Sequence, residues 1–248
     1  MGKGENMQSF FDWVVYEFTR TFIRDQRWTI FAQGFKNTLV ITIFATLIGV
    51  VIGMAVAVVH DFASDSEIAG RKTPGALLLT ALDKVFSVYV SIVRGTPLAI
   101  QLTIMAFIIM AGNSNKVLVC IIAFGVNSGG YVSEVIRGGI GAVDKGQMEA
   151  GRSLGFNRIT CMWLIVLPQA MANILPSLCN EGIAVLKETS IVGLISVVDL
   201  TRASDLVRSR TLSPYFPLIS VAIVYYVLVA GLSSLVRRLE KHMGRSKA

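Results

Sequence analysis

The chain of 248 residues is apolar throughout: 53% of its residues are hydrophobic, 16% are charged, and the mean hydropathy is +0.63. This composition excludes an ordinary soluble domain and predicts an all-α, polytopic membrane protein. The 23 basic and 16 acidic residues give a net charge of +7, which in a soluble protein would raise the question of nucleic acid. Because the basic residues gather at the ends of apolar runs, we interpret them as orientation signals and expect no nucleic-acid partner.

The N-terminal segment, residues 1–32, is too charged to span a membrane, but it carries aromatic side chains at helical spacing, including Phe10, Phe11 and Trp13. We expect this amphipathic segment to lie at the interface of the lipid bilayer. It lacks an apolar run with a small-residue cleavage site, so no cleaved leader is expected. The membrane-spanning domain is expected to occupy residues 33–241, and residues 242–248 are expected to form a cytoplasmic basic tail.

Apolar runs of about 20 residues, enough to cross a hydrocarbon core about 30 Å thick, predict about five membrane spans. Three runs need little argument, at Thr38 to Val59, Val117 to Ile136 and Phe216 to Val236, and Met162 to Leu186 is a further span. The run from Ala76 to Ala111 contains charges and a Gly-Thr-Pro turn. It is either one kinked span with an interfacial lead-in or two short spans.

The number of spans decides on which side the N-terminus lies. Basic residues follow the last span and also surround the polar segment before Met162, and two crossings separate these regions, so both are expected in the cytoplasm. One span over residues 85–111 gives five spans and an outside N-terminus, whereas two short spans give six. The basic N-terminal segment favours six on charge alone. We adopt five, because it places Asp83, Lys84 and Arg94 near an interface instead of in lipid, where charge is costly.

The remaining small, sulfur-containing and imidazole side chains predict packing and not chemistry. Small residues in the first span offer a face for close helix contact: Gly49, Gly53, Ala55 and Ala57. The three cysteines have no paired or metal-ligand spacing and are expected to be buried apolar groups: Cys120, Cys161 and Cys179. Both histidines, His60 and His242, are expected to be solvated. We therefore expect no metal site and no catalytic residue.

A polar face on the third span is the first candidate for a translocation path. Asn127, Tyr131 and Glu134 follow at steps of four and three, which places them on one side of a helix. Because polar groups are costly in lipid, this side is expected to face the bundle interior. Asn127, Ser128 and Tyr131 can hydrogen-bond a zwitterion. Glu134 can instead simply pair with Arg137.

Two interruptions of apolar runs supply the other path candidates. The Arg94-Gly95-Thr96-Pro97 turn breaks a helix and leaves carbonyl groups that only protein or water can satisfy at membrane depth. Its path candidates are Arg94, Thr96 and the nearby Gln101, and the alternative is a bend needed only for packing. Lys187-Glu188-Thr189-Ser190 interrupts a later run. There Thr189 and Ser190 either line a cavity or only break the helix.

A polar turn, Glu149-Ala150-Gly151-Arg152-Ser153-Leu154-Gly155-Phe156, stands between apolar runs. We expect a short helix that begins near Asp144 or Lys145, presents Glu149 and Ala150, and reaches Gly155, which permits backbone conformations that other residues resist. Such a segment in a membrane protein is exposed and can bind a soluble partner. Alternatively, Glu149 only caps the helix and Gly155 only terminates it.

The order Glu149-Ala150-Gly151, three residues, Gly155 and then Leu167-Pro168 resembles the cytoplasmic loop of ABC importer permeases. Arg94-Gly95-Thr96-Pro97-Leu98 and Asn127-Ser128 with Tyr131 resemble the branch of that family that carries polar amino acids. Gly129, Gly130 and Gly151 depart from the alanines usual there. At position 151 this departure should lower helix stability by roughly 1 kcal/mol. The resemblance runs from about Gln33 to Lys241 and also favours five spans.

The resemblance implies a permease subunit that couples to a separate ATPase through the loop 145–159, with contacts from Glu149, Ala150, Gly151 and Gly155. The chain has no Gly-rich loop ending in Gly-Lys-Ser or Gly-Lys-Thr, so ATP and Mg are expected on two copies of the ATPase and not on this chain. Further expected partners are a second permease, identical or homologous, and an extracytoplasmic amino-acid-binding protein. The expected location is the bacterial inner membrane.

Two alternatives from other classes remain. An ion-coupled secondary transporter of small polar solutes would need unpaired acids at the membrane midplane or inverted repeats, neither of which is clear in the sequence. A membrane enzyme would need converging Ser-His or Cys-His pairs or a metal cluster, and the spans suggest none.

Overall fold

The computed structural model is nearly all helical over the residues that it describes, 2–64 and 73–245. Its α-helices are α1 (Gly2–Phe18), α2 (Trp28–Ala63), α3 (Pro74–Gly95), α4 (Leu98–Ile104), α5 (Lys116–Gly141), α6 (Lys145–Ser153), α7 (Arg158–Cys161), α8 (Leu167–Glu188), α9 (Leu200–Thr211) and α10 (Phe216–Arg245). Short π-helical turns follow α1 (Thr19–Ile23), α4 (Met105–Ile109) and α7 (Met162–Val166), and 3-10 turns occupy Arg24–Gln26 and Thr189–Ile195. Residues 246–248 of the expected basic tail lie outside the described residues.

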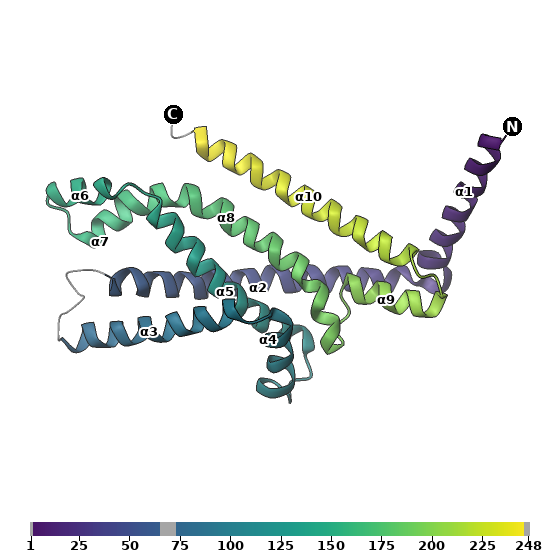
Figure 1. Ribbon diagram of the computed structural model, residues 1–248, viewed down its shortest axis with the longest axis horizontal. Coiled ribbons are helices and arrows are strands. Elements are labelled where there is room, and N and C mark those ends of the chain that lie inside the picture. The colour runs from purple at the N-terminus through teal and green to yellow at the C-terminus, as the bar shows by residue number, and fades with distance from the viewer. Residues whose placement is uncertain (1, 65–72, 246–248) are drawn as a thin grey trace.

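Five helical segments of the described chain are long and apolar enough to cross a membrane, which confirms the expected number of spans. They are Trp28–Ala63, Pro74–Gly95, Lys116–Gly141, Arg158–Ile195 and Phe216–Lys241. The spans run back and forth between two ends of the molecule (Figure 1). We call these the α6 end, where α6 and α7 lie, and the α9 end, where α9 lies and α1 begins its projection.

The second span differs from the expected one over residues 85–111. It is α3, which starts at Pro74 because Thr73 accepts a hydrogen bond from the backbone N–H of Ala76 at 3.4 Å and proline suits a first helical turn. Asp83 and Lys84 therefore lie within the second span, in α3, and not before it. Asp83 has a partner there: its Oδ1 lies 2.8 Å from His60 Nδ1, so His60 is not merely solvated.

α5 is the central span. Buried residues make up 72% of its most apolar window, against at most 33% in any other span. The small-residue face of α2 packs against α5 of the same chain. A Cβ added to Gly53 would lie 2.5 Å from Val132, and one added to Gly49 would lie 2.7 Å from the Ser128 hydroxyl. Glycine at these positions lets the two backbones approach closely.

The N-terminal segment forms α1, which projects from the α9 end (Figure 1). Its base is attached to the loop between α9 and α10, because Ser213 donates a 2.6 Å hydrogen bond to the buried carboxylate of Glu17 and Arg20 donates to the Thr211 carbonyl. The chain then turns at Asp25, whose φ is 54°, and α2 begins at Trp28, before the expected boundary at residue 33.

Candidate functional site

The polar turn at the α6 end forms the short helix that the sequence predicts. Asp144 accepts a 2.9 Å hydrogen bond from the Gly146 N–H and caps α6, so the predicted start is confirmed. Glu149 and Ala150 are exposed on this helix. Gly155 follows its end with φ of 89°, a conformation that side chains with a Cβ rarely adopt.

Gly151 faces inward, unlike its two neighbours. A Cβ at this position would lie 2.7 Å from Cys161 Sγ and 2.8 Å from Ile165 Cδ1, well inside ordinary contact distance. Cys161 is fully buried and fills the space that an alanine methyl group would need. An alanine at this position would therefore require the Cys161 or Ile165 side chain to move, a cost that helix propensity alone does not include.

The break between α3 and α4 lies at Gly95–Pro97, as predicted, and Gln101 satisfies the carbonyl groups that it frees. Gln101 Nε2 donates to the Val93 carbonyl at 2.8 Å and to the Thr96 hydroxyl at 2.8 Å. Gln101 Oε1 accepts from Asn127 Nδ2 at 3.0 Å, and Asn127 is buried. Three of the path candidates thus form one network that joins the helix break to α5.

Arg94 and Tyr131 belong to a second cluster on the polar face of α5. The Arg94 guanidinium lies 5.7 Å from the centre of the Tyr131 ring and 3.1 Å from Glu134 Oε2. Arg137 also binds Glu134, with contacts of 3.1 and 2.6 Å to its two oxygens. Glu134 therefore pairs with Arg137, as the simpler interpretation held, and with Arg94 from α3 as well.

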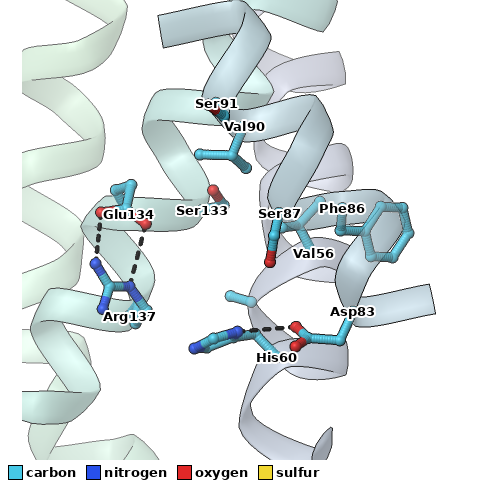
Figure 2. Close-up of a pocket in the computed structure, with 11 residues that line it drawn as sticks. Val56, His60, Asp83, Phe86, Ser87, Val90, Ser91, Ser133, Glu134 and Arg137 are labelled. Carbon is cyan, nitrogen blue, oxygen red and sulfur yellow. Dashed lines mark hydrogen bonds and ion pairs between the residues drawn. The ribbon is translucent and has the colours of Figure 1, made fainter. Parts of the chain in front are cut away.

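A cavity of about 230 Å³ lies beside this cluster, between α2, α3 and α5. Figure 2 shows two bonded pairs on its walls, the ion pair of Glu134 with Arg137 on α5 and the hydrogen-bonded His60 and Asp83 between α2 and α3. Hydroxyl groups of Ser87, Ser91 and Ser133 complete the polar lining. His60 and Asp83 were not among the residues predicted for this site, because residues 23 positions apart show no local pattern in the sequence.

The two candidates at the end of α8 lie apart from these clusters. Thr189 is fully buried and donates to the Leu186 carbonyl at 2.7 Å. Ser190 is half-buried and lines a cavity of about 330 Å³ near the α9 end, together with Thr201 and Arg202. The helix break predicted at this point is confirmed, since α8 ends at Glu188. In this conformation Thr189 has no open surface.

Glu181 was not predicted either, and α8 places it against the polar face of α5. Ser128 Oγ donates to Glu181 Oε1 at 3.2 Å, and the glutamate is half-buried. An acidic residue within an apolar run is visible in the sequence, but its contact depends on how α8 packs on α5. Across the residues that the structure describes, no three His, Cys, Asp or Glu side chains gather into a candidate metal site.

Known proteins provide independent comparisons for this arrangement. The model of the family described as binding-protein-dependent transport system inner membrane component matches residues 74–245. A putative glutamine transport system permease protein of Rickettsia typhi is 38% identical over 214 residues, which cover 85% of this chain and 91% of that protein. The L-cystine transport system permease protein of Bacillus subtilis is 31% identical over 226 residues, 90% of each chain. The arginine transport system permease protein of Bacillus subtilis is 32% identical over 216 residues, 85% of this chain and 91% of that protein.

Solved structures agree with the fold. The crystal structure of an amino acid ABC transporter with histidines has a TM-score of 0.76 at 36% identity and covers 86% of this chain and 94% of its own. An inward-facing MetNI methionine ABC transporter has a TM-score of 0.66 at 18% identity, with 87% and 98% covered. The second likeness concerns the fold alone.

Proposed function

Because the chain belongs to the family of binding-protein-dependent transport system inner membrane components, we propose that it imports polar amino acids as the permease subunit of an ABC transporter. It is a multi-pass membrane protein, with five candidate spans among the residues that the structure describes. The main observation behind this proposal is the exposed helix α6 between two spans. The relatives of this chain are named as permeases for glutamine, cystine and arginine. The location proposed for it is the bacterial inner membrane.

The α6 end is the proposed cytoplasmic end. Basic side chains gather there, on the segment that holds α6 and α7 and in the last turns of α10, which agrees with the rule that cytoplasmic segments carry the positive charge. The residues concerned are Arg137, Lys145, Arg152 and Arg158, followed by Arg237, Arg238 and Lys241. With five spans, the N-terminus and α1 are then on the outer side, and the exposed aromatic side chains of α1 suit the membrane interface.

The loop 145–159 is the proposed contact with the ATPase. Its exposed residues, Glu149 and Ala150, present a small, charged surface that suits a groove, and Gly155 allows the chain to turn back at once. Gly151 acts from the inner side, because it lets α6 lie directly on Cys161. A rigid attachment of α6 to the following helix is what a lever needs to pass movement from the ATPase to the spans.

The family works with an ATPase and a binding protein, so the energy source lies on another chain. The finer proposal is an assembly of two permeases, identical or homologous, with two ATPase copies that bind ATP and Mg and an extracytoplasmic protein that delivers the amino acid. Closure of the ATPase pair would favour one of two conformations of the spans, the population shift that alternating access requires. This chain is not itself expected to hydrolyse ATP.

The polar face of α5 is the proposed wall of the translocation path. Asn127, Ser128 and Tyr131 stand on it, and Arg94 faces Tyr131 from α3. Arg94 and Glu134 form an ion pair in this conformation, and a passing zwitterion can compete for either charge. Asn127→Ala and Tyr131→Phe are expected to slow uptake in assembled complexes. If both variants transport normally, the assignment of this path fails.

The experiment that tests the function reconstitutes the permease with its candidate ATPase and binding protein and measures ATP hydrolysis with a panel of amino acids. A few polar amino acids should stimulate hydrolysis. Gly155→Asp should abolish the stimulation, because it adds a side chain at positive φ, whereas Gly141→Asp, at an exposed glycine with open space and no positive φ, should retain it.

Other outcomes separate the parts of the proposal. If the complex assembles and no amino acid stimulates hydrolysis, the polar amino acid assignment fails. If no complex assembles, the assignment of the loop 145–159 fails. Uptake that does not depend on ATP but depends on an ion gradient would instead establish the ion-coupled alternative.

A further inference from the structure

We propose that the cavity of about 230 Å³ between α2, α3 and α5, here called the inner cavity, binds the transported amino acid before its release to the cytoplasm. This inference rests on the proposed import of polar amino acids and adds a binding site to their route. The cavity is slightly smaller than the pockets of about 300–1,000 Å³ that hold drug-sized ligands, so its volume suits a small solute.

The inner cavity lies in the half of the bundle that ends at α6. Its α5 wall consists of Ser133, Glu134 and Arg137, close to the end of that helix at Gly141. Its α2 wall includes His60, in the last turn of that helix. Figure 1 shows that α2 ends, and α3 starts, at the same end of the molecule as α6. A solute that leaves the polar face of α5 toward the proposed cytoplasmic side therefore reaches this cavity next.

α3 presents a polar side to the inner cavity. Ser87, Ser91 and Arg94 follow at steps of four and three, so they share one side of the helix, and both serines line the cavity. Val88 and Ile92, each 58% exposed, lie about 100° further round the same helix. Because polar groups are costly against lipid, we expect the serine side to face an aqueous route and the side of Val88 to face lipid.

The inner cavity carries charges of both signs, as a free amino acid does. Asp83 is hydrogen-bonded to the His60 ring at 2.8 Å, and among the described residues no lysine or arginine forms an ion pair with it. Its carboxylate can therefore receive an ammonium group. Arg137 binds Glu134 through Nε and Nη2, which leaves its Nη1 donors for a carboxylate group. Figure 2 shows Asp83 and Arg137 on different sides of the cavity.

Hydroxyl groups supply the remaining polar contacts. Ser87 and Ser91 are exposed, and the side chain of neither makes a hydrogen bond with another described residue. Ser133 donates to the Gly130 carbonyl at 2.7 Å, so its oxygen remains available as an acceptor. The net contribution of a hydrogen bond between neutral groups is modest, because water competes for the same partners. Such contacts suit a site that must release its ligand.

The first part of the test places a cysteine on each side of α3 in the reconstituted permease–ATPase complex. Ser87→Cys and Ser91→Cys should react with a charged, membrane-impermeant thiol reagent. Val88→Cys and Ile92→Cys are matched controls on the same helix and should react about tenfold more slowly or less, because an apolar environment disfavours the reactive thiolate. The wild-type chain, whose cysteines are buried or half-buried, gives the background.

The second part measures binding as protection from this reagent. Arginine and glutamine should slow the labelling of Ser87→Cys, whereas N-acetylglutamine, which lacks the ammonium group, should not. Adding Asp83→Asn should raise the half-protecting concentration about tenfold or more, because a charge-assisted hydrogen bond is lost. Asp83→Glu keeps the charge and should retain protection, which separates binding from folding. Asp12→Asn, at an exposed position of α1, and the labelling of Glu240→Cys, at an exposed position of α10, should show no such effects.

Labelling of the serine side without protection would overturn the inference, because the cavity would then admit water and bind no amino acid. Equal labelling of Ser87→Cys and Val88→Cys, or an unchanged half-protecting concentration with Asp83→Asn, would overturn it as well. In each of these cases, stimulation of ATP hydrolysis by amino acids would still support the import function. A wild-type complex that no amino acid stimulates would remove both the inference and the proposed function.

Discussion

Arg158 of α7 donates hydrogen bonds to Asp61 near the end of α2, at 3.0 Å to its backbone oxygen and 3.2 Å to its carboxylate. Both side chains are mostly buried, with 22% and 24% of their surfaces exposed. The contact joins the segment of α6 and α7 to the first span, 97 residues earlier in the chain. Movement of the loop 145–159 therefore acts on α2 directly as well as through α8.

This contact predicts that Arg158→Ala weakens the coupling between ATP hydrolysis and uptake. We expect uptake per ATP hydrolysed to fall about fivefold or more, because couplings between sites are typically about 1–3 kcal/mol. The measurement is the ratio of the two rates in the reconstituted complex. Arg238→Ala, at an exposed arginine of α10, is the matched control.

Exchange of the two charges sharpens this test. Asp61→Arg combined with Arg158→Asp should recover part of the coupling that each single variant loses, because the ion pair is restored in reverse. Full coupling in Arg158→Ala would show that α2 and the loop do not communicate through this contact.

Gly151→Ala should destabilise the permease although alanine favours helices. Its methyl group would meet Cys161 Sγ and Ile165 Cδ1 at less than 3 Å, and overpacking of this kind costs about 1–3 kcal/mol. We expect a lower Tm and weaker binding of the ATPase. Gly138→Ala, on the open side of α5, is the control and should be neutral or stabilising.

The double variant Gly151→Ala with Cys161→Ala removes the sulfur atom that blocks the methyl group. Its Tm should exceed that of Gly151→Ala alone. If the second substitution brings no recovery, the glycine serves some other purpose than contact with Cys161.

The local sequence predicted α6 correctly, whereas contacts between spans that are distant in the sequence could not be predicted. The cap at Asp144 and the turn at Gly155 both depend on residues within or next to the helix. The second span was misplaced because the cost of charge at Asp83 was judged without its partner, and that partner, His60, comes from another helix. The role of Gln101 at the helix break depends likewise on the fold, since its hydrogen bonds reach α3 and α5.

Gln101→Leu should lower the stability of the permease. It removes the donor that serves the Val93 and Thr96 carbonyl groups and leaves the buried Asn127 amide unpaired, at a cost of about 1–3 kcal/mol for such a group. The measurement is thermal unfolding of the purified permease. Gln33→Leu, at an exposed glutamine of α2, should have a much smaller effect.

A double variant tests the part of this loss that belongs to Asn127. Gln101→Leu with Asn127→Leu removes both partners of their hydrogen bond. The double variant should therefore lose less stability than the sum of the losses in the two single variants. Strict additivity would mean that the 3.0 Å contact contributes nothing to stability.

Asp199 should make stability depend on pH. It is fully buried between the fourth and fifth spans, caps α9 through the backbone N–H groups of Thr201 and Arg202, and accepts a 3.3 Å hydrogen bond from Tyr225. Burial raises the pKa of Asp199 above its ordinary value of 3.8, although the hydrogen bonds from the N–H groups lower it in part.

A carboxyl group whose pKa is raised by folding stabilises the fold fully below its unfolded pKa. That contribution is lost as the pH rises through the folded pKa. Asp199→Asn keeps an acceptor for the cap and has no charge to bury, so its Tm relative to wild type should rise as the pH increases from below 3.8 to neutral. Comparing each variant with wild type at the same pH cancels the titration of all other carboxylates. A Tm difference that stays constant over this range would contradict the raised pKa and leave Asp199 as a cap whose charge is fully compensated.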